Sequence, residues 1–277
     1  MKTFGERLHR ALARRGPLCV GIDPHPSLLA SWGLGDDVDG LTRFIRTVEE
    51  ALADQVAVFK PQSAFFERFG SRGVAVLEST IRQLRDAGAL VLLDAKRGDI
   101  GSTMAAYADA YLNPSSPIYV DAITVSPYLG FGSLQPAFEM AARYGGGVFV
   151  LALTSNPEGP SVQHARSSDG RTVAQTIIDE ISQLNAGAEG LGSIGAVVGA
   201  TVGRTGHDLS KMGGPFLVPG MGTQGGDPSG LREIFGDSID AVLPSYSREV
   251  LMAGPSVSGL RAAAERSLES CRAALTG

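Results

Sequence analysis

Eight short apolar segments alternate with amphipathic helical patterns along the 277 residues of this chain. A short apolar run between turn signals is typical of a strand that is buried on both faces. Strands that alternate with helices form parallel sheets, and eight such units predict a closed (β/α)8 barrel, the TIM barrel. The expected strands lie at residues 17–23, 56–59, 90–93 with a continuation toward 96, 122–125, 148–153, 194–200, 216–218 and 241–243.

The helical segments are predicted from apolar residues that recur every three or four positions. Thr3 is a candidate N-cap for the first helix, and Gly88 can end the third. Residues 32–40 are expected to form a loop. Because no linker or shift in composition divides the sequence, we expect a single domain over residues 1–277. The expected helices lie at residues 4–12, 41–52, 74–84, 104–112, 134–144, 173–184 and 257–271.

Composition narrows the classes of function. With 43% hydrophobic and 19% charged residues, the chain can bury a substantial core. A net charge of −5 and scattered basic residues argue against a nucleic-acid or anionic membrane surface. No apolar run is long enough to span a membrane, and the N-terminus has no signal core. Cys19 and Cys271 form no CxxC motif, which favours a reducing compartment and argues against a zinc site. We therefore expect a cytoplasmic protein without a metal.

The third expected strand leads into a dense group of charges. Residues 90–100 read LVLLDAKRGDI, so that Asp94, Lys96 and Asp99 follow four apolar residues. Asp94 and Lys96 would share a face if the strand continues to Lys96, because side chains alternate along a strand. Asp99 follows Gly98, and strand periodicity does not place it. A structural ion pair at a strand end is the alternative to a functional site.

Polar residues also follow most of the other expected strands. In a (β/α)8 barrel the C-terminal ends of the strands form one face, which carries the active site. Six polar strand ends are much less compatible with an accidental ion pair than one would be, so we predict a functional site on this face. The residues that predict it are Asp23, Lys60, Asp94 with Lys96, Ser155, Gln224 and Arg248.

Two loops near the C-terminus favour a phosphate group as part of the ligand. Residues 219–226 read PGMGTQGG and offer exposed backbone N–H groups, while Arg248 adds a guanidinium after the eighth strand. Loops after strands seven and eight are the recurring phosphate site of this fold. The GxGxxG pattern within this segment lies too far along the chain for a dinucleotide fingerprint. Residues 157–171, rich in Gly, Pro and Ser, are a candidate lid.

These motifs together resemble those of the orotidine 5'-phosphate decarboxylase family, in particular its longer bacterial group that includes actinobacterial enzymes. The DxKxxD signature of the family is present as Asp94-Ala-Lys96-Arg-Gly-Asp99. The resemblance extends over almost the whole chain, through CVGIDP at 19–24, Lys60, TSNP at 154–157, PGMGTQGGD at 219–227 and Ser247-Arg248. DxKxxD alone is shared with magnesium-dependent relatives, and the combination is the specific signal.

The resemblance implies a cofactor-free decarboxylation of orotidine 5'-monophosphate (OMP) to UMP in de novo pyrimidine biosynthesis. It also implies a homodimer with shared active sites. Lys96 would protonate C6, Asp94 would lie against the substrate carboxylate, and Lys60 would complete the charge network. Asp99 and Thr103 would reach into the partner's site. The ligand contacts that the resemblance implies are Asp23 for the ribose, Ser155 for the pyrimidine, and Gln224, Arg248 and the nearby backbone of Gly225 and Ser247 for the phosphate.

Two other functions remain as alternatives. The first is a magnesium-dependent sugar-phosphate decarboxylase or aldolase on the same barrel, which needs carboxylates free to bind the metal. Lys60 and Lys96 beside the two aspartates make such a site less favourable. The second is a non-catalytic phosphate-binding barrel, which would bind UMP without turning over OMP.

Overall fold

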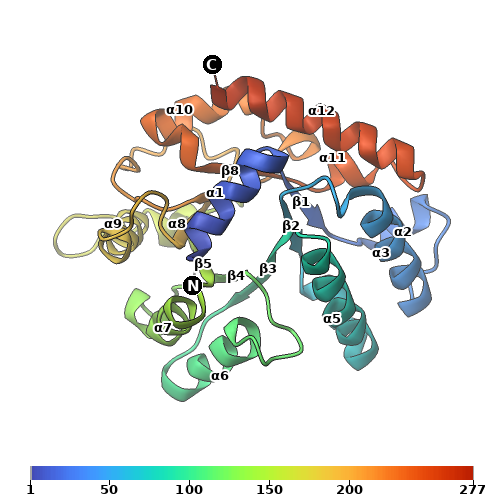
Figure 1. Ribbon diagram of the computed structural model, residues 1–277. Helices are drawn as coiled ribbons and strands as arrows, with labels where there is room; N and C mark the ends of the chain where they lie inside the picture. The colour runs from blue at the N-terminus through green and yellow to red at the C-terminus, as the bar shows by residue number, and fades with distance from the viewer. Residues whose placement is uncertain (1, 277) are drawn as a thin grey trace.

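The computed structural model describes residues 2–276 and contains a closed barrel of eight parallel strands (Figure 1). The strands pair in sequence order, and β8 pairs with β1 to close the barrel. The predicted (β/α)8 barrel is therefore confirmed. The strands are β1 (Cys19–Ile22), β2 (Val58–Pro61), β3 (Leu90–Arg97), β4 (Ala122–Val125), β5 (Gly147–Leu153), β6 (Ile194–Val198), β7 (Phe216–Pro219) and β8 (Val242–Tyr246).

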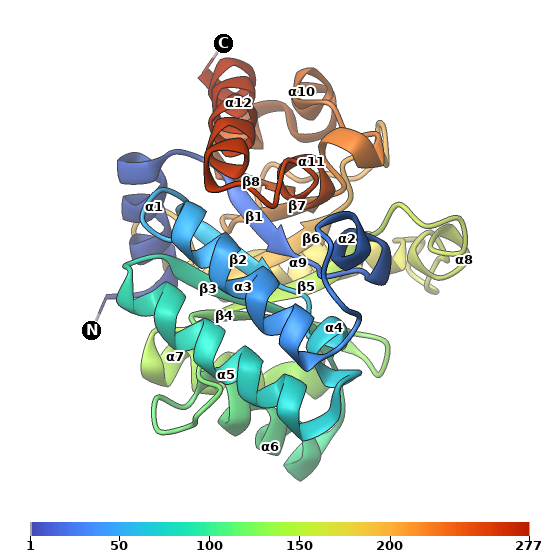
Figure 2. The ribbon, with the colours of Figure 1, turned by 90° about the vertical axis from the view of Figure 1, so that its right-hand side faces the viewer.

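Helices surround the barrel, as Figures 1 and 2 show. The long ones match the seven predicted helices, some with longer bounds. They are α1 (Phe4–Arg15), α3 (Val38–Leu52), α5 (Gly70–Asp86), α6 (Gly101–Leu112), α7 (Gln135–Tyr144), α9 (Val173–Asn185) and α12 (Val257–Thr276). Short helical pieces lie between them: α2 (Pro26–Ser31), α4 (Ala64–Glu67), η1 (Phe131–Leu134), α8 (Pro160–Gln163), η2 (Gly222–Gln224), η3 (Pro228–Gly230), α10 (Leu231–Phe235), η4 (Gly236–Ala241) and α11 (Arg248–Leu251).

Several predicted boundaries were wrong. The strand expected at 56–59 lies at Val58–Pro61, because the charge of Lys60 is paired inside the barrel and does not end the strand. The eighth strand continues past Leu243 through Pro244, although proline usually marks a strand end. Helix α3 begins at Val38, inside the segment expected to be a loop, because Asp37 caps its N-terminus by accepting from the N–H of Gly40.

Helix α1 closes the N-terminal end of the barrel. The Thr3 hydroxyl and the Glu6 carboxylate cap its first turn reciprocally, which confirms Thr3 as the N-cap. Phe4 is fully buried and packs edge-on against Phe149 of β5, with 5.8 Å between the ring centroids. A side chain at Gly147 would collide with the Phe4 ring, so this glycine permits the close approach. The barrel is thus sealed at one end, which leaves its other end for a ligand.

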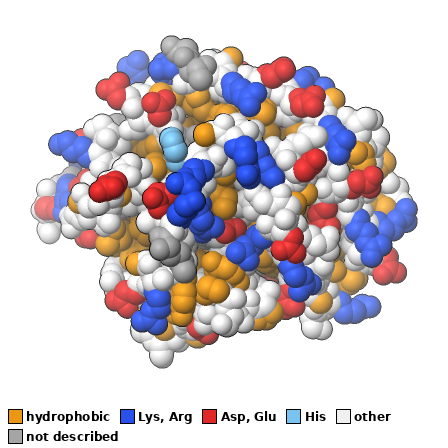
Figure 3. Space-filling view, viewed as in Figure 1, with side chains coloured by type: hydrophobic (Ala, Val, Ile, Leu, Met, Phe, Trp, Pro, Cys, Tyr) orange, Lys and Arg blue, Asp and Glu red, His pale blue; other side chains and the backbone are white. Residues whose placement is uncertain are grey.

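The two ends of the barrel are distinct in Figure 2, where α1 lies at the left and α8 at the right. A large apolar core fills the space between the strands and the outer helices, and a smaller one fills the barrel interior under α1. On the face that Figure 3 shows, basic and acidic side chains are interspersed. In the part of the chain that the structure describes, no helix has the length and apolarity needed to cross a membrane.

Candidate active site

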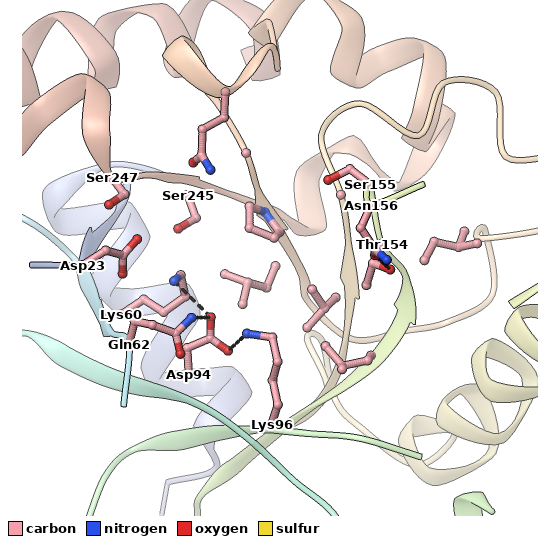
Figure 4. A pocket seen from close by; sticks show the side chains of 18 residues that line it. Asp23, Lys60, Gln62, Asp94, Lys96, Thr154, Ser155, Asn156, Ser245 and Ser247 are labelled. Carbon is pink, nitrogen blue, oxygen red and sulfur yellow. Dashed lines mark hydrogen bonds and ion pairs between the residues drawn. The ribbon is translucent and has the colours of Figure 1, made fainter. Parts of the chain in front are cut away.

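A cavity of about 300 Å³ opens at the C-terminal ends of the strands. Charged side chains lie on one side of it, and Thr154, Ser155 and Asn156 lie on the opposite side (Figure 4). Leu151, Leu153, Val197 and Leu217 add apolar surface, as is usual for a small-molecule site. The remaining lining residues are Asp23, Lys60, Gln62, Asp94, Lys96, Gly199, Pro219, Gly220, Gln224, Ser245 and Ser247.

Asp94 is the centre of the charged side. One carboxylate oxygen, Oδ1, accepts from Lys96 Nζ at 2.6 Å and from the Thr124 hydroxyl at 2.8 Å. The other, Oδ2, accepts from Gln62 Nε2 at 2.9 Å and from Lys60 Nζ at 3.2 Å (Figure 4). The carboxylate therefore has four donors from strands β2, β3 and β4 and the residue after β2. Such a network fixes the carboxylate in one orientation.

Burial and charge together set the ionisation of this group. Burial alone would raise the pKa of Asp94, but Lys60 and Lys96 outweigh it and hold the pKa well below its usual range. Burial would likewise lower the pKa of Lys60, but the carboxylates of Asp23 and Asp94 raise it above its ordinary value. At neutral pH the site therefore contains a buried ammonium and a buried carboxylate.

Lys96 differs from Lys60 in both exposure and backbone. The Lys96 side chain is 45% exposed whereas that of Lys60 is 5% exposed, so Lys96 presents its ammonium to the cavity. Lys96 has a φ of 47°, and among the described residues it is the one non-glycine with positive φ. The register between β3 and β4 also shifts between Leu93 and Arg97. The strand does continue past Lys96, and the Asp94 and Lys96 side chains meet through an irregular strand end. Strained backbone of this kind is concentrated at functional sites.

Two further polar groups lie on the β1–β8 side. Asp23 Oδ1 and Ser247 Oγ are both buried, and neither forms a hydrogen bond with another described residue. Both residues line the cavity, and both side chains lie against Gly21. Buried polar atoms without partners are rare in proteins, and here they can bind hydroxyl groups of a ligand.

The loop after β7 forms another part of the cavity wall. Gln224 ends η2 and lines the cavity, and the exposed Gly225 follows in a left-handed conformation with a φ of 100°. The N–H of Thr223 donates to a Glu249 carboxylate oxygen at 3.2 Å, which ties this loop to α11. Arg248 is exposed at the start of α11, next to Ser247. The residues predicted to bind phosphate thus lie in adjoining segments after β7 and β8. Gln224 and Ser247 line the cavity, whereas Gly225 and Arg248 are not among the described residues that line it.

Asp99 and Thr103 lie apart from the other predicted residues. Asp99 follows the end of β3, and its carboxylate accepts from the N–H of Ile100 at 2.8 Å. Thr103 is exposed in the first turn of α6. Neither is among the described residues that line the cavity of their own chain.

Sequence reasoning missed three side chains at this site. Gln62 and Thr124 both donate to Asp94, and Ser245 lines the cavity. Thr124 had a detectable signal, because it is a polar residue within the apolar run Ala122–Val125. Gln62 directly follows β2 and Ser245 lies within β8, and the predicted ends of both strands were too early by two residues or more.

The candidate lid, residues 157–171, contains the short helix α8 where only loop was predicted. Gln163, at the end of α8, reaches back to the end of β5: its Oε1 accepts from the N–H of Thr154 at 2.9 Å, and its Nε2 donates to the Thr154 hydroxyl at 2.7 Å. The lid segment is therefore attached to the residue that precedes Ser155.

These features define a class of protein. A closed parallel barrel, sealed at one end and lined at the other by preorganised charges, is the architecture of a TIM-barrel enzyme. Among the described residues, no group of three or more His, Cys, Asp and Glu side chains is arranged to hold a metal ion. The four donors on Asp94 form a fixed network of charges and hydrogen bonds beside the cavity.

The comparisons with known proteins identify the family. The sequence pattern of the orotidine 5'-phosphate decarboxylase / HUMPS family matches residues 16–263, and this chain belongs to that family. The orotidine 5'-phosphate decarboxylase of Salinispora arenicola is 73% identical over 277 residues, covering 100% of both chains. A crystal structure of a Streptomyces avermitilis protein has a TM-score of 0.98 and 62% identity, covering 100% of this chain and 97% of that one. Leishmania donovani OMP decarboxylase has a TM-score of 0.75 and 32% identity, covering 99% and 100%.

Proposed function

We propose that this chain is an orotidine 5'-phosphate decarboxylase, which converts OMP to UMP and carbon dioxide in pyrimidine biosynthesis. The observation that carries the proposal is the Lys60–Asp94–Lys96 network beside a cavity, in a chain of this family. An exposed ammonium held next to a buried carboxylate can deliver a proton to a carbon atom in the cavity.

The reaction needs electrostatic stabilisation more than any other kind. When the bond from C6 to the carboxylate breaks, its electron pair remains on C6 as a vinylic carbanion that the ring does not delocalise. Lys96 stabilises this developing charge and then donates a proton from Nζ to C6, and the amine regains a proton from solvent. Asp94 lies near the departing carboxylate, so their repulsion is relieved as carbon dioxide leaves. Preorganised charges of this kind often contribute more to catalysis than any other single effect.

The remaining lining residues would bind the parts of OMP that do not react. Asp23, with a buried oxygen that has no hydrogen-bond partner among residues 2–276, would accept hydrogen bonds from ribose hydroxyls. Ser155 would bind the pyrimidine. The phosphate would bind to Gln224, Arg248 and the nearby backbone of Gly225 and Ser247, and binding energy gained there can be used in the transition state.

To test the proposal, purified protein is mixed with OMP in the presence of a chelator, and turnover is measured as the loss of OMP absorbance. We expect turnover to survive the chelator, which distinguishes this activity from a magnesium-dependent decarboxylase or aldolase. Chelator-sensitive turnover would favour the metal-dependent alternative, and tight UMP binding without turnover would indicate a non-catalytic barrel.

We further propose a homodimer in which each site is completed by Asp99 and Thr103 of the other chain. Three large apolar side chains on the segments that follow β3 and β4 support it: Ile100 is 62% exposed, Tyr128 79% and Leu129 54%. The loops that carry them adjoin, since the N–H of Ser126 donates to the carbonyl of Arg97 at 2.7 Å. Exposed apolar clusters of this kind mark association surfaces, and a second copy is the occupant that would bring Asp99 to a cavity.

Mixed dimers test this shared site. Asp99→Ala and Lys96→Ala chains should each be inactive alone. In a mixed dimer one site receives both defects and the other receives neither, so activity should recover to about half of wild type per heterodimer. If activity does not recover although subunit exchange is proven, the shared-site proposal is wrong and Asp99 acts within its own chain.

The compartment that we propose is the cytoplasm. Both cysteines are buried and free, and burial raises the pKa of the Cys19 thiol to about 11. Thiols kept free in this way are typical of reducing compartments.

A further inference from the structure

Thr124 lies in β4, 1% exposed, directly behind the charged side of the cavity. Its hydroxyl donates to Asp94 Oδ1 at 2.8 Å. The same oxygen accepts from the backbone N–H of Ala95 at 3.1 Å and from that of Lys96 at 3.0 Å. A hydroxyl has one donor and two acceptor lone pairs, so every hydrogen-bonding capacity of Thr124 is used at this one place.

These contacts occur where the regular hydrogen bonding between β3 and β4 is interrupted. The pairing of β3 with β4 shifts register between Leu93 and Arg97, and Lys96 has the left-handed φ of 47°. Backbone N–H groups at such a shift lose their ladder partners and need other acceptors. Thr124 supplies one acceptor for both N–H groups. Its hydroxyl therefore supports the backbone conformation from which the Lys96 side chain extends.

We propose that Thr124 is a positioning residue for the decarboxylation, an inference that rests on the function proposed above. Its single hydroxyl links the Lys96 backbone to the Asp94 carboxylate. It thereby holds the Lys96 ammonium and the Asp94 carboxylate in contact, with 2.6 Å between Nζ and Oδ1. Thr124 is not among the described residues that line the cavity, so it acts through Asp94 and Lys96. A reactive group held by a buried supporting shell of this kind is preorganised before substrate binds.

The test compares Thr124→Val with Thr124→Ser. Valine keeps the shape of threonine and removes the hydroxyl, whereas serine keeps the hydroxyl. We expect Thr124→Val to lower kcat about tenfold or more and Thr124→Ser to stay within about threefold of wild type. UMP inhibition should change less than about threefold in both variants, because the phosphate-binding segments are not involved.

Thr80→Val is the matched control. Thr80 is also fully buried, but its hydroxyl donates to the Val76 carbonyl within α5, away from the cavity. Its kcat should equal that of wild type even if thermal unfolding shows a comparable loss of stability. If Thr124→Val does not fold, Thr124→Cys takes its place under the same expectation.

Provided that wild type is active, three results would overturn the inference. The first is a kcat of Thr124→Val equal to that of wild type, and the second is a folded Thr124→Ser that is as impaired as Thr124→Val. The third is a loss of UMP affinity in Thr124→Val as large as its loss of kcat. Inactive wild type would instead overturn the proposed function.

Discussion

Glu49, on helix α3 and away from the candidate active site, provides a quantitative test of how burial controls ionisation in this protein. Its carboxylate oxygen Oε1 is buried without a partner among the described residues, in a groove of about 250 Å³ between α3 and α5. Burial raises the pKa of Glu49 to about 7, although the charge of Arg46 opposes the shift. In an unfolded chain a glutamate side chain has a pKa of about 4.3. The folded protein therefore binds this proton more tightly than the unfolded chain does.

The sign of the effect on stability follows from that difference. The contribution of Glu49 is fully favourable below about pH 4, is lost as the pH rises toward about 7, and stays lost above it. For a fully buried group the shift would correspond to about 3.8 kcal/mol, at about 1.4 kcal/mol for each tenfold change in the ionisation constant. Because Glu49 is only partly buried, solvent screening reduces this figure to about 1–2 kcal/mol.

Glu49→Gln removes the charge and keeps the shape, so it should be more stable than wild type by about 1–2 kcal/mol at pH 8 and nearly equal to it at pH 4.5. Urea unfolding at both pH values measures the difference through the transition midpoint. Glu50→Gln, at the exposed neighbouring position, is the control and should show no such dependence on pH. An equal stability difference for Glu49→Gln at both pH values would refute the reasoning.

Three further predictions concern the active site. Lys96→Ala should abolish turnover while UMP still binds measurably in a titration, and near-normal turnover would remove its role as proton donor. Arg248→Ala should weaken phosphorylated ligands by about 10- to 100-fold, at about 1.5–3 kcal/mol for a charge-assisted hydrogen bond, and leave the bare nucleoside unaffected; equal losses for both ligands would exclude a phosphate contact. The lid at 157–171 should be more sensitive to protease without a UMP-like ligand than with it, and Gln163→Ala should increase that sensitivity by releasing Thr154; cleavage that ignores both ligand and mutation would contradict a lid.

The sequence was sufficient for the barrel and for the polar residues that gather near the C-terminal ends of its strands, because both depend on local pattern. Apolar runs mark buried strands, and a closed parallel barrel brings their C-terminal ends to one face whatever the details of packing. Asp23, Lys60, Asp94 and Lys96 could therefore be predicted to approach one another before any distance was known. The short helices α2 and α4 were missed because six and four residues are too few to display helical periodicity.

The supporting contacts could not be predicted because they depend on register between strands. Thr124 meets Asp94 only because β3 and β4 pair as they do, and the register shift before Arg97 has no signature in the sequence. The left-handed backbone of Lys96 is likewise invisible in a pattern of residue types, since lysine seldom adopts it. The periodicity of a single strand also cannot predict whether Asp99 contacts the active site of a neighbouring chain.

The central claim is that Lys96 protonates C6 without help from a metal or cofactor. The most direct measurement is proton NMR of the product formed from OMP in deuterium oxide, with chelator present, by wild type and by Lys96→Ala. We expect wild type to yield UMP carrying a single deuterium at C6, while the variant yields no product in the same time although it binds UMP. Deuterated UMP formed by Lys96→Ala at the wild-type rate would contradict this claim.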